Sequence, residues 1–599
     1  MLLFGVAAAL VVRAENSNNV SLAEEEAALV VEARKVLAAY HDERPQAAER
    51  KLHLICWRPN DREYPADNDE RLTRILEHIQ KFYADEMERI GFGRRTIQLD
   101  YDDAGQLVVH KAVGSAPFED YKKPEGDRVK DDCWPVLKAA GLDPDRETIV
   151  IFTNLSDWDP VKNTFVHKSP YYARGSNKSG LAWQLASPEL DTKNLTLKKP
   201  MIQDGEYGRI SLGKHNTIFI GGIAHELGHG LGLPHCRARD DEKAAYGTAL
   251  MGAGNQTYGD ELRGEGRGTF LTLAHALCLA SHPQFSGSVK GMNLPSKANF
   301  SGMTVKKVES HFSVSGQVSS TIPVYAVIAY LDPEGGSNYD ARTVCAVPTK
   351  EGNFHLDCHP LVKGTKSDIR VVALLANGGK STWQSAYEVA ADGTLDISLM
   401  QVSTELSDFV AALSQDQVAD AKALIESLPE KSRAREVARS ILGGKTGEQL
   451  VLDLYEIPED TSRYSLSRVR PEVEDVGWGK PTYNYIPRPE ALLIAAGKLY
   501  QDGIYAHAPA RHVYQFKEGH QWKKLTGVCG LPDQRGGSVV FRIKADGKEV
   551  FMTPTVEPGV THAYDIDLAG VKQLELVVEN AGDGEAVDWG YWFDPVLSR

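Results

Sequence analysis

The sequence lacks features that define several large classes of proteins. It has no apolar run long enough to cross a bilayer as a helix, which takes about 20 residues. Its 67 lysines and arginines are outnumbered by 82 aspartates and glutamates, so the formal net charge is −15. A nucleic-acid binder usually presents a basic stripe that neutralises phosphates. We therefore expect no transmembrane segment and no nucleic-acid partner.

Cysteine is scarce as well. The 599 residues include seven cysteines and no CxxC pair, so a cysteine zinc site is not predicted. The odd number leaves at least one thiol outside any disulfide. If the protein is exported, some of the others form disulfides. The pairs we consider are Cys345 with Cys358, Cys236 with Cys278, and Cys56 with Cys133.

The N-terminus lacks the basic residues that usually open a signal peptide, but it has the other features. Residues 2–12 form an apolar run of the length typical of a signal-peptide core, and Val12 and Ala14 supply small side chains for cleavage. This pattern predicts a signal peptide at 1–14 and a secreted protein, extracellular or periplasmic. The alternative is a cytosolic protein with an apolar N-terminus.

The length of 599 residues predicts several domains, at about 100–200 residues each. Residues 15–48 have the pattern of an acidic amphipathic helix, either a pro-segment or a lead-in. From 49 to 290 strand-like runs such as ETIVIFTNL alternate with helical spacing, which predicts an α/β domain.

The second half of the chain has a different pattern. Short alternating runs at close spacing predict an Ig-like β-sandwich over residues 296–400. Helical spacing follows at 402–442, and GGKTGEQ at 443–449 is typical of a linker. Strand-like runs return over 450–599 and predict a second all-β domain.

The chemistry is concentrated in the segment HELGHGLGLPH, residues 225–235. On a helix, His225 and His229 lie one turn apart on the same face, so both imidazoles can bind one zinc ion. Glu226 follows the first histidine and can reach water at the metal without being a ligand. The alternative for HExxH alone is a surface helix with two solvated histidines.

The residues after this HExxH segment favour the metal site. Gly232 stands where the helix must end, because glycine readily adopts the positive φ of that position. Pro234 discourages further helix, and the chain can return to place His235 as the third ligand. Three protein ligands leave a coordination position open, which is the catalytic arrangement of zinc.

The extended motif resembles that of the metzincin metallopeptidases. The resemblance implies a five-stranded sheet above the cleft, a methionine turn below the metal, and a closing helix. ALMGAG matches the turn, with Met251 as its methionine, and TFLTLAHALCLASH matches the helix. The strand SGLAWQL resembles the family's substrate-pairing edge strand, whose predicted contact residues are Gly180, Leu181 and Ala182.

The sequence departs from some metzincins after the methionine. Where those proteins have a tyrosine that reaches the zinc, this chain has Ala253, and the nearby Tyr258 has the wrong spacing. His275 and His282 in the closing helix are predicted to be structural. The resemblance implies peptide hydrolysis, in which zinc acidifies water and polarises the scissile carbonyl while Glu226 transfers the proton.

The C-terminal residues 450–599 resemble the NPCBM family of galactose-binding-like β-sandwiches found on many secreted enzymes. The matching segments include GWGKPTYN, DGIYAHAPARHVYQF and DWGYWFDPVL. The resemblance implies a glycan ligand, and the candidates for stacking on sugar are His507, Trp589 and Trp592. The alternative is that these are core residues. Related sandwiches also suggest a structural Ca²⁺, although no acidic ligand cluster is visible.

Three functional hypotheses follow. The first is a secreted zinc endopeptidase that its C-terminal domain directs to glycoproteins. The second is a glycan-binding surface protein with an inactive metalloprotease fold, against which the intact Glu226 argues. The third is a glycosidase, for which no paired-carboxylate site is identifiable in the sequence.

Overall fold

The computed structural model describes residues 24–599 apart from a few short gaps at 66, 123–124, 335–337, 415–416, 443–455, 485–491, 534–535, 583 and 585–586. The predicted signal peptide and the predicted linker at 443–449 lie outside the described residues. The chain divides into two compact units. The first contains the residues up to Ser296 together with 338–342 and 374–380, and the second contains the remainder.

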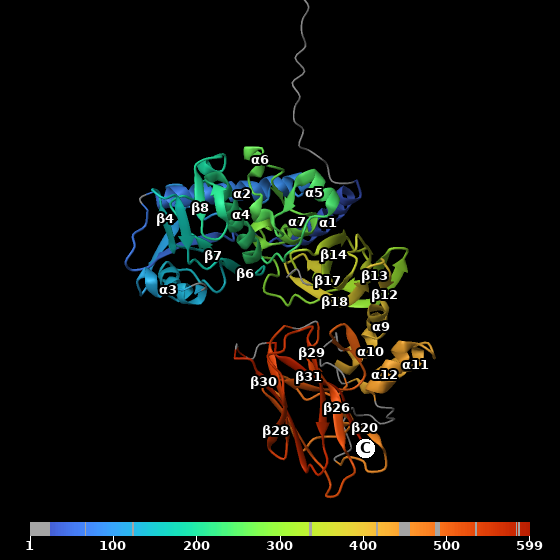
Figure 1. Cartoon of the computed structure of the whole chain (residues 1–599). Coiled ribbons are helices and arrows are strands. Elements are labelled where there is room, and N and C mark those ends of the chain that lie inside the picture. The colour runs from blue at the N-terminus through green and yellow to red at the C-terminus, as the bar shows by residue number, and fades with distance from the viewer. Residues whose placement is uncertain are drawn as a thin grey trace, which may run out of the picture. The chain divides into compact units, whose positions relative to one another are not determined.

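The first unit is built on a five-stranded mixed sheet (Figure 1). Its strands, in spatial order, are β2 (Val109–Val113), β1 (Leu52–Arg58), β3 (Thr148–Thr153), β7 (Gly180–Leu185) and β6 (Tyr172–Gly175). The first four are parallel, and β6 runs antiparallel to β7. Strands β3 and β7 are buried on both faces, which agrees with the unbroken apolar run at residues 149–152 of β3.

Helices cover both faces of this sheet. On one side, α3 (Gly126–Ala139) packs Val129, Cys133 and Leu137 against Ile55 and Trp57 of β1. The other long helices are α1 (Glu24–Asp42), α2 (Asn68–Ile90) and α4 (Leu212–Gly230). The Tyr83 hydroxyl of α2 donates to the Ala224 carbonyl of α4 at 2.9 Å, so these two helices are in contact.

Shorter elements complete the first unit. A four-stranded sheet leads into α4; its strands are β4 (Ser156–Asp159), β5 (Thr164–His167), β8 (Met201–Asp204) and β9 (Gly208–Ser211). After α4 come α5 (Asp240–Tyr246), β10 (Thr248–Ala249), α6 (Asp260–Arg263), β11 (Thr269–Phe270), α7 (Leu273–Ala280) and α8 (Pro283–Ser286). The predicted closing helix is therefore present as α7.

The second unit begins with two sheets that enclose one apolar core, containing Phe312, Val327 and Leu356 among others. One sheet contains β12 (Asn299–Val308), β13 (His311–Ser319) and β16 (Asn353–Cys358). The other contains β15 (Arg342–Ala346), β14 (Val324–Pro333), β17 (Thr365–Leu375), β18 (Lys380–Val389) and β19 (Leu395–Asp396). Short strands in two layers are what the sequence predicted for residues 296–400.

Four helices follow, namely α9 (Ser398–Glu405), α10 (Ser407–Ser414), α11 (Val418–Ser427) and α12 (Arg433–Ile441). They do not form a separate core. Their apolar residues, such as Phe409 and Val437, share one buried cluster with Leu493, Tyr505 and Phe593 of the C-terminal domain. The sequence pattern predicted the helices but could not predict this shared core.

The C-terminal domain is a β-sandwich. One sheet contains β20 (Arg463–Ser465), β31 (Trp589–Ser598), β26 (Lys524–Gly530) and β29 (Thr561–Asp567), with β24 (Gly503–His507) also paired to β31. The other contains β21 (Val473–Asp475), β25 (Ala510–Gln515), β30 (Gln573–Asn580), β27 (Val539–Ala545) and β28 (Lys548–Met552). A separate hairpin joins β22 (Leu493–Ala495) to β23 (Lys498–Tyr500).

The disulfides expected for an exported chain are not formed. All seven cysteines lie within the described residues, and none is disulfide-bonded there. Cys56 faces Asn68 of α2, whereas Cys133 packs on the opposite face of the sheet, because successive strand side chains alternate. Cys345 and Cys358 lie on strands of two different sheets.

The third expected pair is also wrong. Cys236 and Cys278 are both free thiols, and the Cys236 sulfur lies 3.5 Å from the Thr272 hydroxyl and 3.7 Å from His275 Nδ1. Among the described residues, no helix is long and apolar enough to cross a membrane.

Candidate metal centre

Helix α4 carries the zinc motif, and its ends are well defined. Its first turn is capped by Ser211, whose hydroxyl accepts a hydrogen bond from the Lys214 amide. Its last turn closes on Gly232, at φ +82°, which donates to the His229 carbonyl at 2.8 Å. The next amide, of Leu233, donates to the Gly228 carbonyl at 2.9 Å. This pair of bonds is a Schellman motif, in which Gly230 is the last residue of the helix, Leu231 the C-cap and Gly232 the following residue with positive φ.

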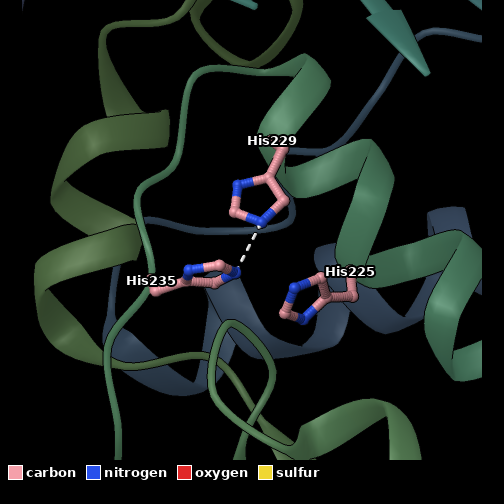
Figure 2. Close-up of side chains that lie close together, drawn as sticks. All are labelled: His225, His229 and His235. Carbon is pink, nitrogen blue, oxygen red and sulfur yellow. Dashed lines mark hydrogen bonds between the residues drawn. The ribbon is translucent and has the colours of Figure 1, made fainter. Parts of the chain in front are cut away.

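The turn brings His235 back beside the helix. Figure 2 shows His225 and His229 projecting from α4 toward His235 on the following loop. One ligand atom from each of the three residues lies within 4.8 Å of the other two. His229 Nε2 and His235 Nε2 are 2.9 Å apart. The structure therefore brings together the three residues that the sequence predicted as ligands.

The hydrogen bonds fix which nitrogen of two histidines carries the proton. His225 Nδ1 donates to the Leu250 carbonyl at 2.7 Å, and His229 Nδ1 donates to the Leu233 carbonyl at 2.8 Å. Each Nε2 then presents its lone pair to the centre, as a metal ligand must. Burial lowers the pKa of His225 to about 3 and also lowers that of His229, so both are neutral. This donor set fits zinc.

Glu226 lies next to His225 on α4 and is half-buried. Burial raises the pKa of its carboxyl to about 7. A carboxyl with such a pKa can both accept and release a proton near neutral pH, which is the property that a general base and acid needs.

Met251 occupies the position that the methionine turn predicts. Its side chain is fully buried, and a Cβ added to Gly228 of α4 would lie only 2.4 Å from the Met251 sulfur. Glycine at 228 therefore allows the turn to pack directly against the motif helix. The same turn supplies the Leu250 carbonyl that orients His225.

The predicted substrate edge strand is wrong. Gly180, Leu181 and Ala182 lie on β7, which pairs with β3 on one side and β6 on the other. Its backbone is therefore occupied on both sides, and the strand at this end of the sheet is β6, which precedes β7 in the chain but lies beyond it in the sheet. The sequence could not show this, because the order of strands in a sheet depends on tertiary contacts. Gly180 has a different role, which is to let β7 approach α4 closely. A Cβ at this position would lie 1.9 Å from the Gly230 carbonyl oxygen of α4.

Other histidines and tyrosines near the motif lie outside the metal centre. His275 and His282 are buried, and burial lowers the pKa of each to about 3. Tyr258 is buried and packs against His78 and Phe82. Sequence reasoning missed one residue at the centre, Tyr339, whose ring stacks on His235. It lies far along the chain in a stretch without a motif, so no sequence signal pointed to it.

The predicted sugar-stacking residues are buried. Trp592 is fully buried in the core between the two C-terminal sheets, against Phe541 and Tyr564. His507 and Trp589 are also buried, so none of the three can stack on a sugar at the surface. Strand β31 is covered on both faces, because Trp592 packs into the core between the two sheets and Trp589 into the cluster shared with α9–α12. The exposed aromatic side chain beside them is Trp478, with 47% of its surface accessible and its ring 5.1 Å from Trp589.

Among the described residues, His225, His229 and His235 form the one cluster with the spacing of a metal site. The suggested structural Ca²⁺ therefore stays a prediction without assigned ligands.

Comparison with known proteins identifies the C-terminal domain. Residues 462–598 match the NPCBM/NEW2 domain family, which confirms that resemblance. A comparison with curated proteins gave no significant match.

Several solved structures are similar to this chain. Wild-type OgpA from Akkermansia muciniphila is 26% identical, with a TM-score of 0.47 over 58% of this chain and 97% of that one. Inactive OgpA in complex with the O-glycopeptide glycodrosocin is 25% identical, with a TM-score of 0.46 over 58% and 96%. The M60 catalytic domain of Clostridium perfringens ZmpB with two CBM51 domains is 13% identical, with a TM-score of 0.24 over 65% and 40%.

Proposed function

We propose that this protein is a secreted, zinc-dependent endopeptidase of the metzincin type that acts on glycoproteins. The observation that carries the proposal is the convergence of His225, His229 and His235 within 4.8 Å, next to the half-buried Glu226. The two Nδ1–H bonds to backbone carbonyls support it, because they aim both Nε2 lone pairs at one point.

The chemistry follows from these groups. Zinc held by the three imidazoles supplies Lewis-acid chemistry, which polarises a peptide carbonyl and acidifies water. Glu226 accepts the proton of the attacking water and then donates it to the amide nitrogen as the C–N bond breaks. Its raised pKa suits both steps. Substrate in extended conformation is expected to pair with β6, the edge strand next to β7.

Metal analysis combined with casein cleavage tests the proposal. We would compare the wild type with Glu226→Gln and with the surface control Glu77→Gln. We expect a single zinc ion in all three proteins, full activity in the control, and a loss of at least about 1,000-fold in kcat for Glu226→Gln, because the proton relay is removed. Wild-type protein that holds no zinc would overturn the ligand assignment.

Glycoprotein targeting rests on the NPCBM match at 462–598. We expect kcat/KM on a mucin-type glycoprotein to exceed that on the same protein after enzymatic deglycosylation. Equal values would argue against targeting. If zinc is bound and neither casein nor the glycoprotein is cleaved, the glycan-binding protein without peptidase activity becomes the better hypothesis.

A further inference from the structure

The loop that carries His235 is held by two segments from much later in the sequence. These segments belong to the first compact unit: 338–342 follows β14, and 374–380 runs from the end of β17 to the start of β18. The Lys380 ammonium donates to the Gly232 carbonyl at 2.5 Å, just before His235. The Arg237 amide donates to the Ala341 carbonyl at 2.8 Å, just after it. Both ends of the ligand loop are therefore fixed from outside the motif.

Segment 338–342 also places an aromatic side chain on the metal centre. The Tyr339 ring lies 3.6 Å, centroid to centroid, from the His235 ring, and the planes differ by 28°. It is also nearly parallel to the His225 ring, at 6.0 Å and 12°. A stacked ring restricts rotation of the imidazole beneath it. Tyr339 is therefore one of the side chains that hold the His235 ring in place.

Tyr339 is unlike a core residue, because 45% of its surface is accessible. One face of the ring covers His235, while part of the side chain stays open to solvent. The phenol thus lies beside two of the three predicted ligands, His235 and His225, and its accessible part is open to substrate as well as to solvent.

We propose that Tyr339 is a working part of the active centre, resting on the peptidase function proposed above. Its ring positions His235 for metal binding, and its hydroxyl donates a hydrogen bond to the scissile carbonyl oxygen as negative charge develops there. Some metzincins have a tyrosine at the position of Ala253, shortly after the methionine of the turn. In this chain Tyr339, from a different part of the sequence, takes that role. The catalytic centre is incomplete without segment 338–342.

Metal binding tests the positioning role without using activity. We would measure zinc affinity by competition with a chelator, and the visible spectrum of the Co²⁺ form, for the full-length wild type, Tyr339→Phe and Tyr339→Ala. Tyr339→Phe keeps the stacked ring and should bind zinc as the wild type does. Tyr339→Ala should bind zinc about 10–100-fold more weakly, as is usual when a group that orients a ligand is lost, and should change the Co²⁺ spectrum.

Kinetics test the hydroxyl. Tyr339→Phe, fully loaded with zinc, should lose on the order of 100-fold in kcat with little change in KM, because the lost bond acts in the transition state. The control is Tyr101→Phe, a phenol that bonds Glu77 at the surface and should have no effect. Thermal melting of each variant shows whether it is folded.

The outcomes separate this inference from the proposed function. Wild-type affinity and spectrum in Tyr339→Ala would overturn the positioning role, and wild-type kcat in Tyr339→Phe would overturn the role of the hydroxyl. If the wild type binds zinc but cleaves nothing, the peptidase proposal fails and the hydroxyl role fails with it, while the metal measurements still decide the positioning role. If the wild type binds no zinc, both proposals are wrong.

Discussion

Burial fixes the protonation of a histidine that the metal centre does not use. His282 is 4% exposed; its Nε2–H donates to the Ser176 carbonyl and its Nδ1 accepts from the Gln284 amide, both at 3.3 Å. Both ring nitrogens are satisfied only in the neutral form. The pKa is accordingly lowered from 6.5 to about 3, mainly by desolvation.

This histidine should make the protein less stable in acid. In the unfolded chain His282 binds a proton below pH 6.5, whereas in the folded chain it stays neutral down to about pH 3. The free energy of unfolding therefore falls as the pH decreases through that window, by up to about 1.4 kcal/mol per pH unit from this residue. Urea unfolding at pH 7 and pH 5 should show a smaller difference for His282→Gln than for the wild type. An equal difference would contradict the assignment.

A second residue-scale prediction concerns Trp478. Its indole packs beside the buried Trp589 and is itself exposed. Trp478 is therefore the residue of this aromatic pair that is accessible from solvent. We expect Trp478→Ala to weaken binding of mucin-type glycans by about tenfold, since stacking on a sugar is lost. Met552→Ala, which truncates another exposed side chain of the same domain, is the control. If Trp478→Ala binds the glycans as tightly as the wild type does, the sugar site lies elsewhere.

At the scale of single elements, the end of α4 controls the metal centre. Gly232 has φ +82°, and a Cβ there would also lie 3.2 Å from the Ser176 backbone. Alanine is strained in this conformation, so the turn that returns His235 to the helix should shift.

We expect Gly232→Ala to lose about 1 kcal/mol of stability and also to bind zinc more weakly. Gly141→Ala is a matched control, because Gly141 has φ +84° but no neighbour within 4 Å. It should lose a similar stability and keep the zinc affinity of the wild type. Urea unfolding and chelator competition on both variants would check this. Equal zinc affinities would show that the turn is not what places His235.

At the scale of the whole molecule, the helices α9–α12 depend on the C-terminal domain. They bury Phe409, Val410 and Val437 in a cluster that Leu493, Tyr505 and Phe593 complete. Helices that lose such a partner expose a continuous apolar face.

A chain that ends at residue 442 should therefore expose this face. We expect it to bind a hydrophobic dye and to scatter light at concentrations where the full-length protein stays monodisperse. A chain that ends at 405, after α9, lacks most of that face and should bind less dye. Low dye binding by the 442 chain would show that the helices form a core of their own.

The sequence by itself determined the metal motif, the end of its helix and the nature of the C-terminal domain. These features are local: the spacing of His225 and His229 follows from the helical repeat, and Gly232 from backbone sterics. The NPCBM segments were recognisable because they are contiguous. The patterns of residues 296–400 and 402–442 likewise predicted strands and helices in the right places.

Only the tertiary structure decided which strand lies at the sheet edge, which aromatic side chains are exposed, and that Tyr339 joins the metal centre. Each of these depends on contacts between residues far apart in the chain. β6 is an edge strand because β7 inserts between it and β3, and Trp592 is buried because a second sheet covers it. Tyr339 reaches His235 because segment 338–342 packs with the first unit. Sequence periodicity predicts which face of a helix or strand is apolar, but it does not predict which other element that face packs against.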